Sequence, residues 1–176
     1  MIAYTQAQSE EEIQEILHLQ NQNLPSSLDK KEMLEQGFLT VEHSFELLWR
    51  MNQSFPHTLA KKNGKVIGYA LSMNAKFAND IPILHSLFKE IRNTYSSEDF
   101  IVMGQICIAK EYRGRGIFRG LYQNMQRFIK GSYETIITEV DIRNTRSMNA
   151  HKAIGFKELV RHESNGKVWS LIVLKK

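Results

Sequence analysis

The sequence predicts a mixed α/β fold of the α+β type, with a largely antiparallel central sheet flanked by helices. Strand-like runs alternate with helical periodicities, two Asn-Gly pairs mark tight hairpins, and a strand–helix–strand unit occupies about residues 100–140. That unit is expected to be parallel and right-handed. Because no repeat or linker divides the 176 residues, we expect one domain over residues 1–176.

The first half is predicted to hold one short strand, three helical regions and a β-hairpin. Ser9 and Glu12 form a capping box, which indicates a helix start. The pair Asn63-Gly64 favours a two-residue hairpin turn. In chain order, we expect a strand at 2–4, helices after Ser9 and at 28–36 and 42–52, and strands at 58–61 and 66–73.

The second half alternates strands and helices and ends in another hairpin. Apolar side chains recur at helical spacing over 118–129, which is typical of a helix packed on a core. Gly131 and Gly155 are expected to end helices. The predicted segments are a helix from Pro82, strands at 100–108 and 135–140, helices at 118–129 and 146–154, and hairpin strands at 156–162 and 168–175.

Composition and charge exclude several classes of protein. The chain is 42% hydrophobic and 24% charged, with a formal charge of +4. No apolar run reaches the roughly 20 residues that span a bilayer, and the N-terminus lacks the pattern of a secretory signal. The lone Cys107 excludes an intramolecular disulfide and fits a reducing compartment. We therefore expect a cytoplasmic protein that does not bind a membrane. We also expect no binding of nucleic acid, because the Gly-Arg turn lacks interleaved aromatic residues.

The most informative segment is the turn between the strand at 100–108 and the following helix. Gly114 and Gly116 allow a tight turn and close approach to a ligand, and N–H groups at a helix start favour phosphate oxygens. Arg113 and Arg115 can add charge-assisted hydrogen bonds. The turn lacks the Gly-Lys-Ser/Thr ending of a Walker loop and does not complete G-x-G-x-x-G, so neither of those phosphate loops is present.

Two segments resemble the GCN5-related N-acetyltransferase (GNAT) superfamily. The first is similar to the family's Q/R-x-x-G-x-G/A signature, which binds the pyrophosphate of acetyl-CoA, and consists of Arg113, Gly114, Arg115, Gly116, Ile117 and Phe118. Phe118 stands where most members have Gly or Ala, which implies different packing at the helix start. Residues 144–156 are similar to the family's N-x-x-A/S-x-x-x-Y-x-x-x-G-F stretch. The resemblance covers about residues 100–156 and implies a GNAT-like domain.

The resemblance also implies which residues contact the cofactor. The backbone of the fourth strand, at Ile106, Cys107 and Ile108, would pair with the pantetheine amides in the manner of an added strand. Asn144 and Ser147 share a helical face with His151, and family members use that face against the pantetheine arm and the sulfur. Acetyl-CoA is the implied cosubstrate. No metal is implied, because the histidines show no metal-ligand spacing.

Catalysis requires a proton acceptor for the attacking amine and a proton donor for the departing thiolate. His151 stands where many relatives carry a tyrosine that protonates the sulfur, so it is the candidate general acid, with simple packing in the helix as the alternative. Glu139 is the candidate base, and Asp141 shares its predicted strand face. An N–H group of the strand at 106–108 is the candidate oxyanion donor. Cys107 is expected to be a small buried hydrophobe rather than a nucleophile.

These inferences predict an acyl-CoA-dependent N-acyltransferase, with acetyl-CoA as the expected donor and direct attack by a primary amine. The alternative is a catalytically silent acyl-CoA sensor or regulatory module with the same fold. The acceptor is expected to be a small-molecule or peptide amine. Similar proteins often form homodimers, and no feature of this sequence demonstrates one.

Overall fold

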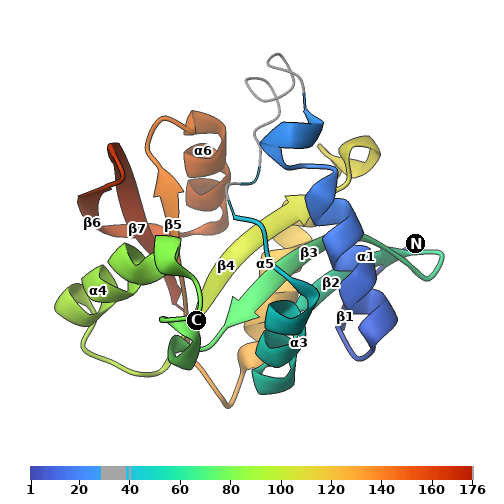
Figure 1. Ribbon diagram of the computed structural model, residues 1–176, viewed down its shortest axis with the longest axis horizontal. Coiled ribbons are helices and arrows are strands. Elements are labelled where there is room, and N and C mark those ends of the chain that lie inside the picture. Colours follow the sequence, from blue (N-terminus) through green and yellow to red (C-terminus); the bar gives the residue numbers. More distant parts are fainter. Residues whose placement is uncertain (29–38, 40, 176) are drawn as a thin grey trace. The chain divides into compact units, whose positions relative to one another are not determined.

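The computed structural model describes residues 1–28, 39 and 41–175 (Figure 1). Within them, seven strands pair in the order β1-β2-β3-β4-β5-β7-β6. The strands are β1 (Ile2–Gln6), β2 (Thr58–Lys62), β3 (Lys65–Met73), β4 (Phe100–Ile108), β5 (Thr135–Asp141), β6 (Lys157–Ser164) and β7 (Lys167–Lys175). β4 and β5 are parallel, whereas β1–β2, β2–β3, β5–β7 and β6–β7 are antiparallel. The predicted mixed sheet with a parallel strand–helix–strand unit is confirmed.

The α-helices are α1 (Glu10–Asn21), α3 (Phe45–Ser54), α4 (His85–Thr94), α5 (Ile117–Ile129) and α6 (Thr145–Ile154). Four short 3₁₀ turns accompany them among the described residues: η1 (Pro25–Ser27), η2 (Ala75–Phe77), η3 (Pro82–Leu84) and η4 (Lys110–Tyr112). The helix predicted at 28–36 lies, beyond residue 28, outside the described residues. The helix predicted from Pro82 begins later, at His85, because Pro82 opens a separate 3₁₀ turn.

Local sequence signals explain several of these boundaries. The capping box at α1 is confirmed, since the Ser9 hydroxyl accepts the Glu12 N–H at 3.4 Å and the Glu12 carboxylate accepts the Ser9 N–H at 3.3 Å. Both hairpin turns place Asn and then Gly at positive φ, 51° and 81° at residues 63 and 64, and 52° and 69° at 165 and 166. Gly155 ends α6 in the left-handed region at φ 116°.

The chain divides into two compact units, each described here by itself. The first consists of Met1–Ser72 and Gly104–Phe128. In this unit α1 and α5 cover opposite faces of the strands. Lys61 of β2 pairs with Glu12 of α1 at 2.6 Å, whereas Tyr4 of β1 lies against Gly120 of α5. Tyr4 is paired with the neighbour of Lys61, so the two side chains point to opposite faces, and Figure 1 shows α5 behind the strands that α1 and α3 cover.

The core of the first unit joins these helices to the strands. It includes the predicted stripe of α5, of which Leu121, Tyr122 and Met125 are fully buried. Fully buried side chains of the other elements are Ile13, Ile16, Leu48, Leu59, Tyr69 and Leu71. Burying a side chain of this size contributes about 1.5–3 kcal/mol, which holds the end of β4 and the start of α5 in place.

The second unit consists of Met73–Met103 and Ile129–Lys176. Its strands β5, β6 and β7 form an antiparallel set beside the first half of β4, and α4 lies against β6 and β7. The end of α6 reaches β7, since a side chain at Gly155 would meet Leu174 at 3.7 Å. The buried face of α4 consists of Leu87, Phe88 and Ile91.

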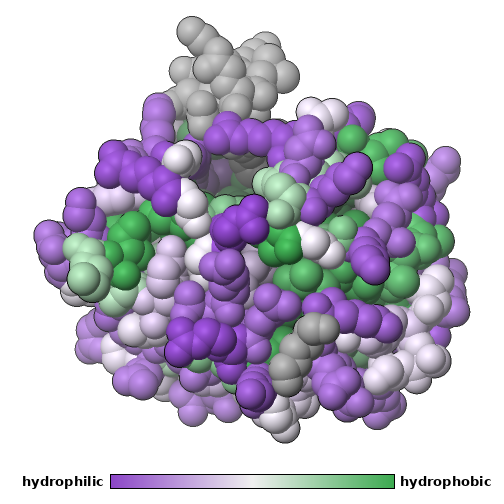
Figure 2. Space-filling view, turned by 180° about the vertical axis from the view of Figure 1, so that it is seen from behind, coloured by the Kyte–Doolittle hydropathy of each residue, from purple (hydrophilic) through white to green (hydrophobic). Residues whose placement is uncertain are grey.

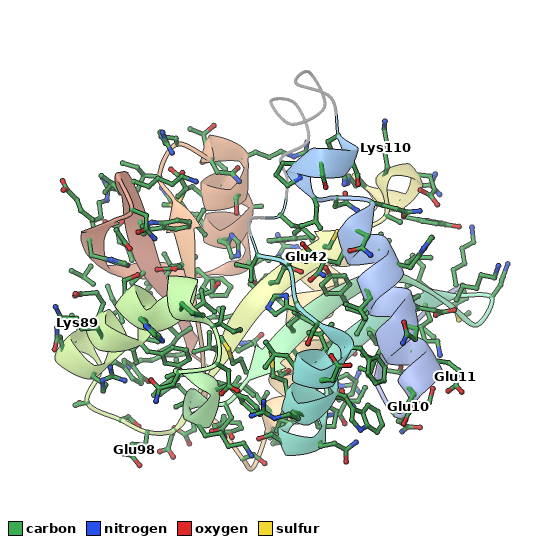
Figure 3. The ribbon with its side chains drawn as sticks, in the orientation of Figure 1. Glu10, Glu11, Glu42, Lys89, Glu98 and Lys110 are labelled. Atoms are coloured by element: carbon green, nitrogen blue, oxygen red, sulfur yellow. The ribbon has the colours of Figure 1, made fainter. Side chains whose placement is uncertain are left out.

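Hydrophilic side chains dominate the molecular face drawn in Figure 2, with hydrophobic ones scattered between them. Among the described residues, only Met1 and Leu159 are large hydrophobic side chains counted as exposed. Glu10 and Glu11 point outward from the first turn of α1 (Figure 3), where acidic groups favour the helix dipole. No helix within the described ranges is both long and apolar enough to cross a membrane.

Candidate cofactor site and candidate catalytic residues

The turn between β4 and α5 is built around two glycines. Gly114 and Gly116 have φ of 72° and 77°, in the left-handed region that favours glycine. An added Cβ at either position would meet no atom within 4 Å. The two glycines are therefore needed for the conformation of the turn rather than for space around it.

A row of backbone donors follows from that conformation. Among the described residues, the N–H groups of Gly114, Gly116 and Ile117 make no backbone hydrogen bond, whereas Arg113 and Gly114 lie in a hydrogen-bonded turn that precedes Arg115. The first helical hydrogen bond of α5 runs from Gly120 to Gly116, at 3.0 Å. Successive N–H groups at a helix start, together with the helix dipole, suit the oxygens of a phosphate or pyrophosphate.

The two arginines of the turn have different surroundings. Arg113 donates from Nε to the Ile108 carbonyl at 3.0 Å and from Nη2 to Asn23 Oδ1 at 2.5 Å. Arg115 is exposed and lies over the Tyr112 ring, 5.5 Å from its centroid. The sequence predicts that both guanidinium groups serve a ligand. Arg113 instead directs at least two of its donors to the protein.

Phe118 finds a partner within its own helix. Its ring meets Tyr122 edge to face, with centroids 5.3 Å apart and planes at 71°. Tyr122 is fully buried, and Phe118 is half-buried. The aromatic side chain at this unusual position therefore packs along α5.

The second half of β4 alternates between buried polar and half-buried apolar side chains. Gln105 accepts the Tyr69 hydroxyl at 2.7 Å and donates to the Val41 carbonyl at 2.7 Å, so protein groups hold both ends of its amide. Burial raises the pKa of the Cys107 thiol to about 12, which keeps it protonated at neutral pH. This agrees with the expectation that Cys107 is no nucleophile. Ile106 and Ile108 are half-buried.

In the second unit, Asn144, Ser147 and His151 form a chain of contacts along α6. Asn144 caps the helix, because its Oδ1 accepts the Ser147 N–H at 3.0 Å. His151 Nδ1 lies 2.8 Å from the Ser147 carbonyl and 3.3 Å from its hydroxyl. Ser147 and His151 therefore meet on one face of α6, whereas Asn144 lies at its N-cap.

The contact with the Ser147 carbonyl determines which ring nitrogen of His151 carries a hydrogen. A carbonyl oxygen can only accept, so Nδ1 must carry a hydrogen. Burial lowers the pKa of His151 to about 4, and the bond to Ser147 opposes that shift. His151 is therefore mostly neutral at pH 7, and it lies edge to face with Phe156 at a centroid distance of 5.0 Å.

Glu139 of β5 is held by a histidine of β6. Its Oε2 lies 3.0 Å from His162 Nε2, and the two side chains are only 9% and 8% exposed. Burial raises the pKa of Glu139 to about 7. Burial also lowers the pKa of His162, while the charge of Glu90 on α4 raises it. Burial thus disfavours the ionised forms of both groups, and it brings the pKa of Glu139 close to neutral pH.

Asp141, two residues along β5, is in a different environment. Its carboxylate accepts from Arg143 Nη2 at 2.8 Å and from Arg143 Nε at 3.1 Å, and the arginine lowers the pKa of Asp141. Glu139 and Asp141 therefore differ in protonation although they are neighbours on one strand. No group of three or more metal-ligating side chains occurs among residues that the structure describes.

Two partners in these clusters were not singled out from the sequence as functional. Asn23 lies 90 positions before Arg113, and His162 lies 23 positions after Glu139. Neither belongs to a recognisable motif. Their roles depend on contacts that the chain makes only after folding.

Comparison with known proteins agrees with this geometry. No curated protein sequence matches the chain. By structure, it is similar to yncA, a putative acetyltransferase from Salmonella typhimurium with its cofactor acetyl-CoA, at a TM-score of 0.67 and 14% identity, over 99% of this chain and 94% of that one. It is also similar to the ribosomal-protein-S18-alanine N-acetyltransferase from Escherichia coli, at a TM-score of 0.65 and 13% identity, over the same shares.

A third similar structure is a putative acetyltransferase from Acinetobacter baylyi, with a TM-score of 0.68 and 17% identity over 100% of this chain and 92% of that one. At such identities the similarity establishes the fold. The Acetyltransferase (GNAT) family itself matches residues 13–156, which span both motifs and most of the sheet. The chain therefore belongs to the GNAT family of acetyltransferases, whose members use acetyl-CoA.

Proposed function

We propose that this protein transfers an acetyl group from acetyl-CoA to a primary amine of a small molecule or peptide. The observation that carries the proposal is the glycine turn before α5, with the N–H groups of Gly114, Gly116 and Ile117 unused by the backbone, in a chain of the GNAT family. These donors suit the pyrophosphate of acetyl-CoA, with Arg115 exposed beside them. The backbone of Ile106–Ile108 would pair with the pantetheine amides, and Asn144 and Ser147 would face the pantetheine arm.

Glu139 is the proposed proton acceptor. An alkyl ammonium has a pKa near that of lysine, about 10.4, so a base must take its proton before the nitrogen can attack. A carboxylate with a pKa of about 7 has a proton affinity matched to neutral conditions. His162, 3.0 Å away, would orient the carboxylate and stabilise its ionised form. The C–N bond then forms as the C–S bond breaks.

His151 is the proposed proton donor to the departing thiolate. Because its Nδ1–H is engaged with Ser147, the donated proton would come from Nε2 of the imidazolium form. A pKa of about 4 makes that form scarce at neutral pH, so Nε2 would first take up a proton from solvent and then pass it to the thiolate sulfur. The alternative function, a silent acyl-CoA sensor, is favoured by this same observation.

The decisive first experiment is a calorimetric titration of the protein with CoA. We expect Gly116→Asp to weaken binding at least about 10-fold, because it places an anion at the phosphate donors and strains a positive φ. Gly64→Asp is the matched control: residue 64 has φ 81°, and an added Cβ meets no atom within 4 Å, but it lies in the β2–β3 turn. Equal CoA affinity in the wild type and Gly116→Asp would place the cofactor elsewhere.

Acetyl transfer itself is tested with a panel of amines by measuring the release of free CoA. Amine-dependent release identifies the enzyme and its acceptor class. CoA binding without release from acetyl-CoA across small and peptide amines would favour the sensor.

A further inference from the structure

Asn23, just beyond the end of α1, is a buried amide whose polar groups are all engaged. Its side chain donates from Nδ2 to the Leu19 carbonyl at 2.8 Å, which fixes the orientation of the amide. Oδ1 therefore faces Arg113 and accepts from its guanidinium at 2.5 Å. The backbone N–H donates to Gln20, and the carbonyl accepts from Leu39, both at 2.9 Å. Asn23 is 6% exposed.

The Arg113 side chain connects the end of β4 to Asn23 just before the glycine turn. Its Nε donates to the Ile108 carbonyl at 3.0 Å, so one side chain spans the five residues from the end of β4 to the turn. Its Nη2 meets Asn23. The guanidinium is a rigid fork, and two acceptors from different elements leave it little freedom.

The proposed pyrophosphate donors begin at the next residue, Gly114. The N–H groups of this turn bind an anion well only if the backbone already holds them in place, because ordering them on binding would cost affinity. The left-handed glycines make this backbone adaptable, so it requires an external constraint. The hydrogen bonds from the Arg113 guanidinium to Ile108 and Asn23 supply this constraint.

We propose that Asn23 is a positioning residue of the cofactor site, acting through Arg113 without touching the ligand. Its Oδ1 holds the guanidinium, and the guanidinium holds the start of the glycine turn. This inference rests on the proposed function. It assigns to the end of α1 a part in CoA binding that lies outside both sequence motifs.

A second buried asparagine of the same unit provides a matched control. Asn52 is 3% exposed, and its Nδ2 donates to the Ala7 carbonyl at 3.2 Å while its Oδ1 accepts the His57 N–H at 2.9 Å. It joins α3 to the segments around β1 and β2. It has no contact with the glycine turn among its hydrogen bonds.

The test measures CoA affinity by calorimetry and thermal stability for the wild type, Asn23→Ala, Asn23→Asp and Asn52→Ala. We expect Asn23→Ala to weaken CoA binding by about 10-fold, the size of a lost hydrogen bond to a charged group. Asn23→Asp keeps an acceptor for Arg113 but loses the donor to Leu19, so its affinity should stay within about 3-fold of the wild type. Asn52→Ala should lower the melting temperature and leave CoA affinity unchanged.

A double-mutant cycle then asks whether Asn23 acts through Arg113. Arg113→Lys cannot donate to both acceptors, so adding Asn23→Ala to it should cause no further loss of CoA affinity. Additive losses, an unchanged affinity in Asn23→Ala, or an equal loss in Asn52→Ala would each overturn the inference. If the wild type binds CoA and one of these results is found, only this inference fails. If the wild type binds no CoA, the proposed function fails too, and this separates the two failures.

Discussion

The Arg113–Asn23 pair of the first unit and the Glu139–His162 pair of the second are both partly buried polar contacts, but only the second pair can change its charge. Arg113 is a permanent cation held by two neutral oxygens. Glu139 and His162 are both titratable, and burial moves the pKa of Glu139 to about 7. If the proposed roles hold, CoA affinity should depend on the fixed geometry of the first pair, and the rate of proton transfer should depend on pH through the second.

The largest effect should come from removing the titratable carboxyl. Glu139→Gln keeps the shape and the hydrogen bond to His162 but cannot accept a proton, so kcat should fall about 100-fold. The affinity for CoA should stay unchanged. Steady-state rates with the best amine, together with calorimetry, measure both.

Asp141→Asn is the control for that loss. Asp141 lies on the same strand, but Arg143 lowers its pKa and keeps it ionised. We expect a change of less than about 3-fold in kcat, because a carboxylate held by a cation is a poor base. A similar loss in both variants, or none in Glu139→Gln, would remove Glu139 from the mechanism.

Protonation should affect the stability of the two units with opposite signs. Burial lowers the pKa of His57 to about 3, so below pH 6.5 the unfolded chain binds the extra proton and stability falls as the pH falls. Glu139 has a raised pKa, so its contribution to stability is lost as the pH rises from about 4.5 towards 7. When the pH falls from 7 to 5, His57 should lower the free energy of unfolding by about 2 kcal/mol.

Urea unfolding at pH 7 and pH 5 measures this dependence. His57 accepts the Ser72 N–H at Nδ1 and lies 3.1 Å from the Leu48 carbonyl at Nε2, and a glutamine can offer both functions without titrating. His57→Gln should therefore lose less stability between the two pH values than the wild type does. An equal loss would show that other groups determine the acid sensitivity.

The rate of acetyl transfer should follow the protonation of Glu139. Because the Glu139 carboxyl must be ionised to accept a proton, kcat should decline about 10-fold per pH unit below a midpoint near 7. CoA affinity should vary little between pH 7 and 8.5, since the proposed phosphate donors are backbone N–H groups. A rate profile that is flat from pH 5 to 8 would contradict the assignment of the base.

The smallest predicted effect concerns Phe118 at the start of α5. Phe118→Leu removes the edge-to-face contact with Tyr122 but keeps apolar bulk, so the free energy of unfolding should fall by about 1 kcal/mol. CoA affinity should change little, because the donors of the turn are backbone groups. A large loss of CoA affinity would assign the ring to the cofactor site itself.

Local sequence signals predicted the boundaries that depend on neighbouring residues. The capping box at Ser9, the two Asn-Gly turns and the left-handed Gly155 each act within one turn of chain, so the sequence suffices to find them. Pro82 shows where such signals fall short. It starts a short 3₁₀ turn, and the apolar face of α4 that packs in the second unit begins only after His85.

The sequence by itself determined the glycine turn, the helix that follows it and the face shared by Ser147 and His151, because these depend on backbone preferences and helical spacing. Only the tertiary structure decided that Arg113 is held by Asn23 and Glu139 by His162, since each contact joins segments that are distant along the chain. It also decided the pKa values of Glu139 and His151. Those follow from desolvation, which exists only once the core has closed around the side chain.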